Sequence, residues 1–245
     1  MSDDQASARY DPREFLEVRR LGRSTYAEAH AEQERLLRAR IAGEVGDQLL
    51  LTEHEPVVTV GRGVGASSVT GLDVPVVEVE RGGEATYHGP GQLVAYPILL
   101  LPEGRRDLHR YLRDLEEVVL RCLAEVGIEG RRESGLTGVW IGTHKVASIG
   151  VAVRRWVTWH GLALNVHTEL EAFRGFQPCG LDPTVMTRVA DHAELPPTTM
   201  LFEVLVVKHL CEVFGLELPP PPPLQSPPED EGGGCGLPQL PIFPS

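Results

Sequence analysis

The chain has 245 residues, of which 42% are hydrophobic and 24% charged, which is the size and composition of a globular protein with a full core. Its formal net charge of -12 argues against a nucleic-acid-binding protein and against attachment to anionic membranes, because both need clustered cations. The longest apolar run, "LVAYPILLL", is too short to span a bilayer, and the acidic start is not a secretory signal. Four widely spaced cysteines without a CxxC pair are typical of reduced thiols, so we expect a cytoplasmic protein.

The first half of the chain predicts one helix and several strands. Residues 1–14 have the composition of a flexible arm, and residues 24–42 that of a helix with Ser24 as its cap. The segment "DQLLLTEHEPVVTVGRG" predicts two strands interrupted at Glu55–Pro56. The segments "VPVVEVERGG" and "GQLVAYPILLL" predict two more, the second buried on both faces.

The second half predicts two helices around three strands. Apolar residues at helical spacing over 108–126 indicate an amphipathic helix, and another helix begins near Thr198 or Thr199 and ends at Gly215. Between them, "GVWIG", "KVASIGVAV" and "WVTWHGLALNV" are expected strands, with a hairpin turn at Arg154–Arg155.

These elements do not alternate as regular βαβ units, so we expect an α+β fold, a mixed β-sheet with flanking helices. We expect it to form one catalytic domain over residues 15–218. Residues 219–245 are rich in proline and glycine and predict a disordered tail.

Lys145 is unusual because only two of the 23 cationic residues are lysines. A buried lysine can exchange a proton, whereas an arginine stays charged. Lys145 lies in "GTHKVASIG", where a glycine turn leads into an apolar strand. It is either a catalytic acid/base or a plain lysine at a strand end.

Two loop segments carry further candidate residues. The segment "RGGEATYHGPGQ", residues 81–92, puts glycines beside polar side chains between two strands, which suits either a ligand loop or a simple turn. In "GFQPCGL", Cys179 lies in a loop before a glycine whose N–H could bind an oxyanion. Lys145, His88, His144 or His160 could accept its proton. The chain has no HExxH, CxxC or i,i+4 histidine pair, so we expect no metal site.

Together these segments resemble the lipoyl(octanoyl) transferases, over roughly residues 15–217. The resemblance rests on "EHEPVVTVGR", "RGGEATYHGPGQLVAYPIL", "GVWIGTHKVASIGV", "HGLALNV" and "PCGL" in this order. It implies the α+β fold of the biotin/lipoate protein ligase-like catalytic domain. It also implies a cysteine–lysine dyad, in which Cys179 carries the acyl thioester and Lys145 is its acid/base partner. The residues that the match assigns to acyl-substrate binding are Arg81, Gly82, Gly83, Glu84, Ala85, Thr86, Tyr87, His88, Ser148, Ile149, Gly150, Gly161, Leu162 and Ala163.

The reaction implied by the resemblance moves an octanoyl group from the phosphopantetheine of acyl carrier protein to a lysine of a lipoyl domain. The implied acceptors are the lipoyl domains of 2-oxoacid dehydrogenase complexes and the glycine cleavage H protein. No cofactor, ATP or metal is implied, because the thioester is already activated. Carrier proteins are acidic, so docking needs a local basic patch, for which Arg105–Arg106, Arg131–Arg132 and Arg154–Arg155 are candidates.

The chain differs from the family pattern at Ser148, where alanine is common, and at Ala152, where arginine is common. Neither position is the proposed nucleophile or base. Two alternatives stay open: an ATP-dependent lipoate or biotin ligase on the same fold, which does not need Cys179, and a non-enzymatic acyl-binding module.

Overall fold

The structure is a computed structural model that describes residues 15–62, 69, 73–174, 176 and 181–220. Its strands are β1 (Glu17–Ser24), β2 (Gln48–His54), β3 (Val57–Val60), β4 (Val76–Glu78), β5 (Ala85–His88), β6 (Gln92–Ile98), β7 (Gly130–Arg131), β8 (Val139–Ile141), β9 (His144–Arg154) and β10 (Val157–Asn165). Its α-helices are α1 (Tyr26–Ala42), α2 (Leu108–Glu125) and α3 (Thr199–Phe214). Short 3-10 helices are η3 (Glu103–Arg105), η4 (Leu170–Phe173), η6 (Pro183–Val185) and η7 (Val189–Asp191).

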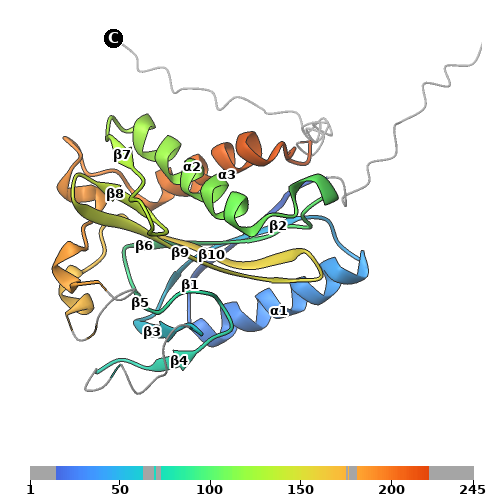
Figure 1. The fold of residues 1–245 in the computed structure, drawn as a ribbon, viewed down its shortest axis with the longest axis horizontal. Helices are drawn as coiled ribbons and strands as arrows, with labels where there is room; N and C mark the ends of the chain where they lie inside the picture. The colour runs from blue at the N-terminus through green and yellow to red at the C-terminus, as the bar shows by residue number, and fades with distance from the viewer. Residues whose placement is uncertain (1–14, 63–68, 70–72, 175, 177–180, 221–245) are drawn as a thin grey trace, which may run out of the picture.

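Two sheets organise the fold (Figure 1). The larger one has seven strands in the order β1-β2-β6-β10-β9-β8-β7, and only β1 and β2 run parallel in it. The smaller one has the order β4-β3-β5, with β3 parallel to β4 and antiparallel to β5. The predicted α+β class with a mixed sheet is therefore confirmed, although the strands divide between two sheets.

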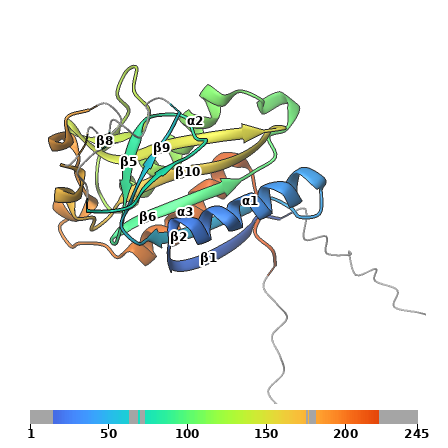
Figure 2. The same cartoon turned by 90° about the horizontal axis from the view of Figure 1, so that it is seen from below.

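The helices cover both faces of the large sheet (Figures 1 and 2). On one face, α2 and α3 lie side by side and enclose the larger apolar core, which includes Tyr111, Leu115 and Phe202. On the other face, α1 packs through Leu36 and Leu37. The small sheet lies on that second face, beside α1.

The start of α1 corrects one prediction and reveals a missed strand. The cap is Thr25, whose hydroxyl accepts from the backbone of Glu28 while the Glu28 carboxylate accepts from the backbone of Thr25, a reciprocal capping box. Ser24, the predicted cap, is instead the last residue of β1. We did not predict β1, because this edge strand is mostly polar and exposed.

Other boundaries agree closely with the sequence. α2 begins at Leu108, and α3 begins after Thr198 and ends at Gly215, whose φ of 69° is left-handed. The hairpin between β9 and β10 turns at Arg155 and Trp156, one residue later than predicted. Within the glycine-rich segment, residues 85–88 form strand β5, where we expected only a loop.

The predicted arm at 1–14 and all but two residues of the predicted tail lie outside the described residues, so those domain boundaries stay predictions. In the part of the chain that is described, no helix combines the length and apolar character needed to cross a membrane.

Candidate active site

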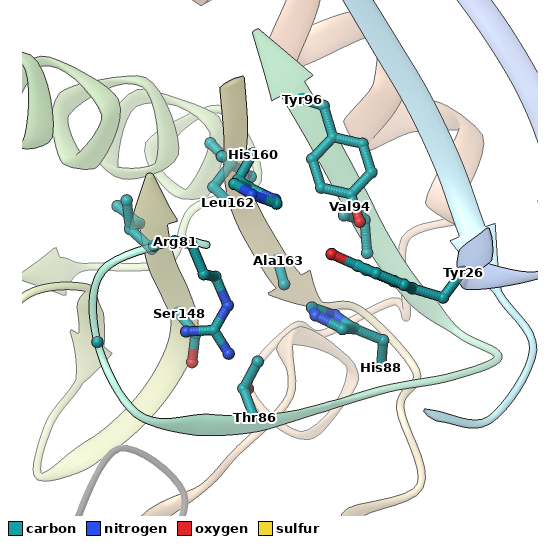
Figure 3. Close-up of a pocket in the computed structure, with 14 residues that line it drawn as sticks. Tyr26, Arg81, Thr86, His88, Val94, Tyr96, Ser148, His160, Leu162 and Ala163 are labelled. Carbon is teal, nitrogen blue, oxygen red and sulfur yellow. The ribbon is translucent and has the colours of Figure 1, made fainter. Parts of the chain in front are cut away.

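A cavity lies between the two sheets on the α1 side of the large sheet (Figure 3). It opens to solvent on one side, and its lining is mostly apolar. The lining residues are Tyr26, Arg81, Gly83, Thr86, His88, Val94, Tyr96, Ser148, Ile149, Gly150, His160, Gly161, Leu162 and Ala163. An apolar space with a few polar groups is the usual form of a small-molecule site.

Two glycines let the walls of this cavity approach each other. A Cβ added at Gly161 would lie 2.1 Å from the carbonyl oxygen of Ala95, so β10 can pair with β6 here only without a side chain. At Gly150, a Cβ would lie 3.0 Å from Cδ of Arg81. The bare backbone at Gly150 thus leaves room for the arginine.

Arg81 brings a cationic group to the cavity. Its Nη2 donates to both the carbonyl oxygen and the hydroxyl of Thr59 at 2.9 Å, and its Nη1 donates to the carbonyl oxygen of Gly82 at 3.1 Å. The backbone N–H of Gly82 also donates to the carbonyl oxygen of Val151 at 2.9 Å. The loop that carries Arg81 is therefore fixed to both sheets.

Three buried histidines lie at or beside the cavity: His54, His88 and His160, which we call the cavity histidines. Burial lowers the pKa of His54 to about 4 and, with help from neighbouring cationic groups, that of His88 and His160 to about 3. At neutral pH all three are therefore uncharged imidazoles and not cations.

Hydrogen bonds hold two of these rings. One nitrogen of His54 shares a 2.7 Å hydrogen bond with the Tyr96 hydroxyl. His88 shares one of 2.7 Å with the side-chain oxygen of Gln92, whose amide nitrogen donates to Asn165 at 2.9 Å. In Figure 3, Tyr26, Tyr96 and His88 converge on one part of the cavity, while Arg81, Thr86 and Ser148 lie together on another.

Lys145 lies at the start of β9, three residues before Ser148, or roughly 10 Å along the strand. Its side chain is buried, with Nζ 5.2 Å from the centroid of the Trp140 ring. A Cβ at Gly138 would lie 2.7 Å from Cε of Lys145, so the absence of a side chain at Gly138 makes space for the lysine. Within the described residues, Lys145 has no carboxylate partner.

Cys179 falls outside the described residues, so its position relative to Lys145 is untested. Residues near it on both sides of the chain are well packed. Phe176 and Met186 belong to one apolar cluster together with Tyr87, and Met186 pairs with Lys145 in an isolated parallel bridge.

Ten of the fourteen predicted substrate-binding residues line the cavity, although their role in binding stays a prediction. The other four are Gly82, Glu84, Ala85 and Tyr87. The ring of Tyr87 turns away and packs edge-on against Phe173, with centroids 5.5 Å apart. Alternate residues of β5 face opposite ways, so Thr86 and His88 face the cavity while Ala85 and Tyr87 join the neighbouring core.

We did not assign Tyr26, Val94, Tyr96 or His160 to the cavity from the sequence. Val94 and Tyr96 are two residues apart on β6, so their shared face is a period-two signal that could have paired them. Tyr26 comes from α1, and only the packing of that helix brings it to β6.

Comparisons with known proteins bear on this site. The family model described as lipoyl protein ligase A/B catalytic domain matches residues 25–211. An octanoyltransferase of Geobacter metallireducens is 52% identical over 164 residues, 67% of this chain and 77% of the relative. An octanoyltransferase of Syntrophotalea carbinolica is 44% identical over 204 residues, 83% of this chain and 97% of the relative.

Solved structures share the fold. A lipoate-protein ligase A bound with ATP superposes with a TM-score of 0.73 at 18% identity, covering 84% of this chain and 87% of that one. The R40G mutant of the Aquifex aeolicus biotin protein ligase has a TM-score of 0.50 at 15% identity, covering 81% and 70%. At these identities the likeness concerns the fold alone.

Proposed function

Since the chain belongs to the octanoyltransferase family, and is therefore an acyltransferase, we propose that it transfers octanoyl from acyl carrier protein to a lysine of lipoyl domains. The proposed donor is the phosphopantetheine thioester of the carrier protein. The proposed acceptors are lipoyl domains of 2-oxoacid dehydrogenase complexes and the glycine cleavage H protein. Transfer proceeds through a thioester on Cys179, without ATP or a metal. Reduced thiols at Cys122 and Cys211 agree with the cytoplasm as its site of action, which stays a prediction.

The observation that carries the mechanism is the buried Lys145 beside Trp140. A lysine enclosed in this way is suited to give and take a proton. In the first half-reaction, the Cys179 thiolate attacks the thioester carbonyl, the bond to the pantetheine sulfur breaks, and Lys145 protonates that sulfur. In the second, the acceptor lysine attacks the acyl-enzyme, Lys145 takes its proton, and the cysteine leaves as thiolate.

The packing of described residues that precede and follow Cys179 in the sequence supports the dyad. Phe176 precedes it by three residues, a span of at most roughly 11 Å of chain, and Phe176 is buried in the same cluster as Met186, the bridge partner of Lys145. The backbone N–H of Thr187 also donates to the carbonyl oxygen of Lys145 at 2.9 Å. These contacts support our proposal that Cys179 and Lys145 act together.

The cavity suits an acyl chain of limited length. Val94, Leu162 and Ala163 supply apolar wall, and each buried methylene contributes about 0.8 kcal/mol. The hydroxyls of Tyr26 and Tyr96 oppose a longer chain in their part of the cavity, because an apolar tail would bury them against methylenes. These hydroxyls limit how far an apolar chain can extend in this part of the cavity.

Of the three arginine pairs, Arg131–Arg132 lies nearest Lys145, since Arg131 faces Trp140 across β7 and β8. Arg132 serves the fold: its Nε donates at 3.0 Å to Glu116, whose carboxylate is fully buried. Arg131 is half-exposed at the surface, where its guanidinium pairs with Glu133 at 2.6 Å and donates to the carbonyl oxygen of Gly142, so a carrier carboxylate would share it with Glu133. We therefore propose Arg131 as the docking cation for the acidic carrier protein.

The other two pairs are poorly placed for docking. Arg105 is bound to the end of α3, where it donates to the carbonyl oxygen of Phe214 at 3.1 Å. Arg154 and Arg155 lie at the far end of the β9–β10 hairpin, nine residues or roughly 30 Å along β9 from Lys145.

The direct test is octanoylation of an apo lipoyl domain by the purified protein, with octanoyl-carrier protein as donor and no ATP. We expect the product with wild type and none with Cys179→Ala. Product only from free octanoate and ATP, retained in Cys179→Ala, would establish a ligase. Binding of the acyl donor without any product would establish an acyl-binding module.

A further inference from the structure

Three side chains from distant parts of the sequence meet behind one wall of the cavity. His30 comes from α1, Glu80 follows β4, and His160 comes from β10, and one ligand atom of each lies within 4.8 Å of the other two. His30 Nε2 and Glu80 Oε2 are 3.5 Å apart. Two imidazoles and one carboxylate are a donor set that binds zinc and related transition metals.

His160 is the buried member of this cluster. Only 2% of it is exposed, and its Nε2 has no hydrogen-bond partner among the described residues. Most buried polar atoms in proteins are paired, because an unmade hydrogen bond costs about 1–3 kcal/mol. An unpaired buried imidazole nitrogen therefore points to a ligand.

The surroundings hold the His160 ring in place. It stacks on Trp159 with centroids 4.2 Å apart, and its backbone is left-handed, with φ of 56°. The backbone N–H donates to the side-chain oxygen of Gln33 on α1 at 3.0 Å. A metal ligand needs such a fixed orientation, and here it comes from ring stacking and the backbone.

We propose that His30, Glu80 and His160 bind one divalent transition-metal ion of the zinc class, with the fourth position open to water. Ligand atoms around a tetrahedral zinc ion lie roughly 3.4 Å apart, given metal–ligand distances of about 2.0–2.1 Å. The His30–Glu80 pair already has this spacing. Since no separation exceeds 4.8 Å, the longest needs to close by at most roughly 1.4 Å, which rotation of the half-buried His30 and Glu80 side chains can supply.

An open hollow on the surface reaches one of the three residues and carries two glutamates. His30 also lines an open hollow on the outside of α1, together with Glu34 and Glu78. On the inner side, the positive charges of Arg62 and Arg81 lie near His160 and repel a bound cation. The Glu80 carboxylate is the anionic ligand that offsets them, so binding should depend strongly on its charge.

This site is separate from the proposed transfer chemistry, which uses no metal. A bound ion would connect α1, the loop that leads to Arg81, and β10, and so fix the cavity wall. Because it binds the folded chain, it should also raise the melting temperature.

The test is a titration of the full-length, tag-free protein with Co²⁺, in a Cys179→Ala background that removes a competing thiol. The readouts are the visible absorption of the Co²⁺ ion, the stoichiometry and the melting temperature. The variants His30→Ala and Glu80→Gln each remove one ligand and leave the core intact. His109→Ala, at an exposed position on α2, is the matched control.

We expect one Co²⁺ per chain with the strong absorption of a four-coordinate ion, unchanged affinity in His109→Ala, and at least tenfold weaker binding in both ligand variants. Zn²⁺ should displace the Co²⁺. Equal binding in all the proteins, or no binding in any of them, overturns the proposal. Far-ultraviolet circular dichroism distinguishes a lost ligand from a lost fold.

Discussion

Replacing Lys145 with methionine removes the amine and keeps a side chain of similar length over Gly138 and Trp140. If Lys145 moves the proton in both half-reactions, kcat should fall roughly 10²- to 10⁴-fold, the contribution of a general acid/base, or about 2.7–5.4 kcal/mol. Stability should change little: the lost contact with Trp140 is worth about 0.5–2 kcal/mol, and removing a buried charge offsets it.

The chain contains its own control, because Lys208 is the only other lysine. It lies on α3, is half-exposed and pairs with Glu125, an ion pair worth about 0–1 kcal/mol. Lys208→Met should therefore keep full activity. Steady-state octanoyl transfer and urea unfolding of both variants provide the two readouts. More than a tenth of wild-type activity in Lys145→Met, or equal losses in both variants, would refute the proton-transfer role.

Three further predictions follow from the same geometry. The cavity histidines have pKa values of about 3 to 4 in the fold against about 6.5 unfolded, so the unfolded state binds more protons below pH 6.5 and stability falls as the pH is lowered. At pH 5, each of these histidines should lower the free energy of unfolding by about 2 kcal/mol relative to pH 7.5, as measured by urea unfolding. A free energy of unfolding that does not change with pH would contradict their buried, neutral state. Ala163→Leu puts a larger side chain into the cavity, so the transfer rate of octanoyl should drop at least tenfold relative to that of hexanoyl. Competition between the two carrier-bound acyl groups measures this ratio, and an unchanged ratio would place the acyl chain elsewhere. Arg131→Glu should raise KM for octanoyl-carrier protein roughly two- to fivefold and spare octanoyl-pantetheine, whereas Arg155→Glu should affect neither; a rise for both donors would argue against docking.

Much of the fold could be predicted because its elements carry strong local signals. The apolar spacing of residues 108–126 and the glycine that follows, Gly127, predict α2 almost to its ends, and Thr198 and Gly215 mark α3. β1 carries no such signal. This segment forms a strand only because β2 pairs with it in parallel, and that pairing is a tertiary contact which the local sequence does not reveal.

Some residues of the candidate site could be predicted from the sequence and others could not. Residues of the glycine-rich segment and of β9 and β10 could be assigned by resemblance, and most of them line one cavity. Tyr26 could not, because its contribution depends on how α1 packs against the sheets. Thr86 and His88 line the cavity and Tyr87 does not, because alternate residues of strand β5 face opposite ways. We expected a loop at these positions, so this alternation could not be predicted.

The His30–Glu80–His160 cluster shows the limit of motif reasoning most clearly. Zinc motifs are recognised by short spacings between ligands, and these three residues are separated by 50 and 80 positions. Only the folded chain brings them together, so the expectation of no metal site rested on spacing alone.

The central claim is that Cys179 carries the octanoyl group during transfer. The most direct measurement is the intact mass of the protein after mixing with octanoyl-carrier protein without ATP and quenching in acid, followed by peptide mapping. The account predicts one octanoyl adduct on Cys179, which hydroxylamine removes and which is absent in Cys179→Ala. A protein that transfers octanoyl at full rate with no adduct, or with an adduct on another residue, would contradict it.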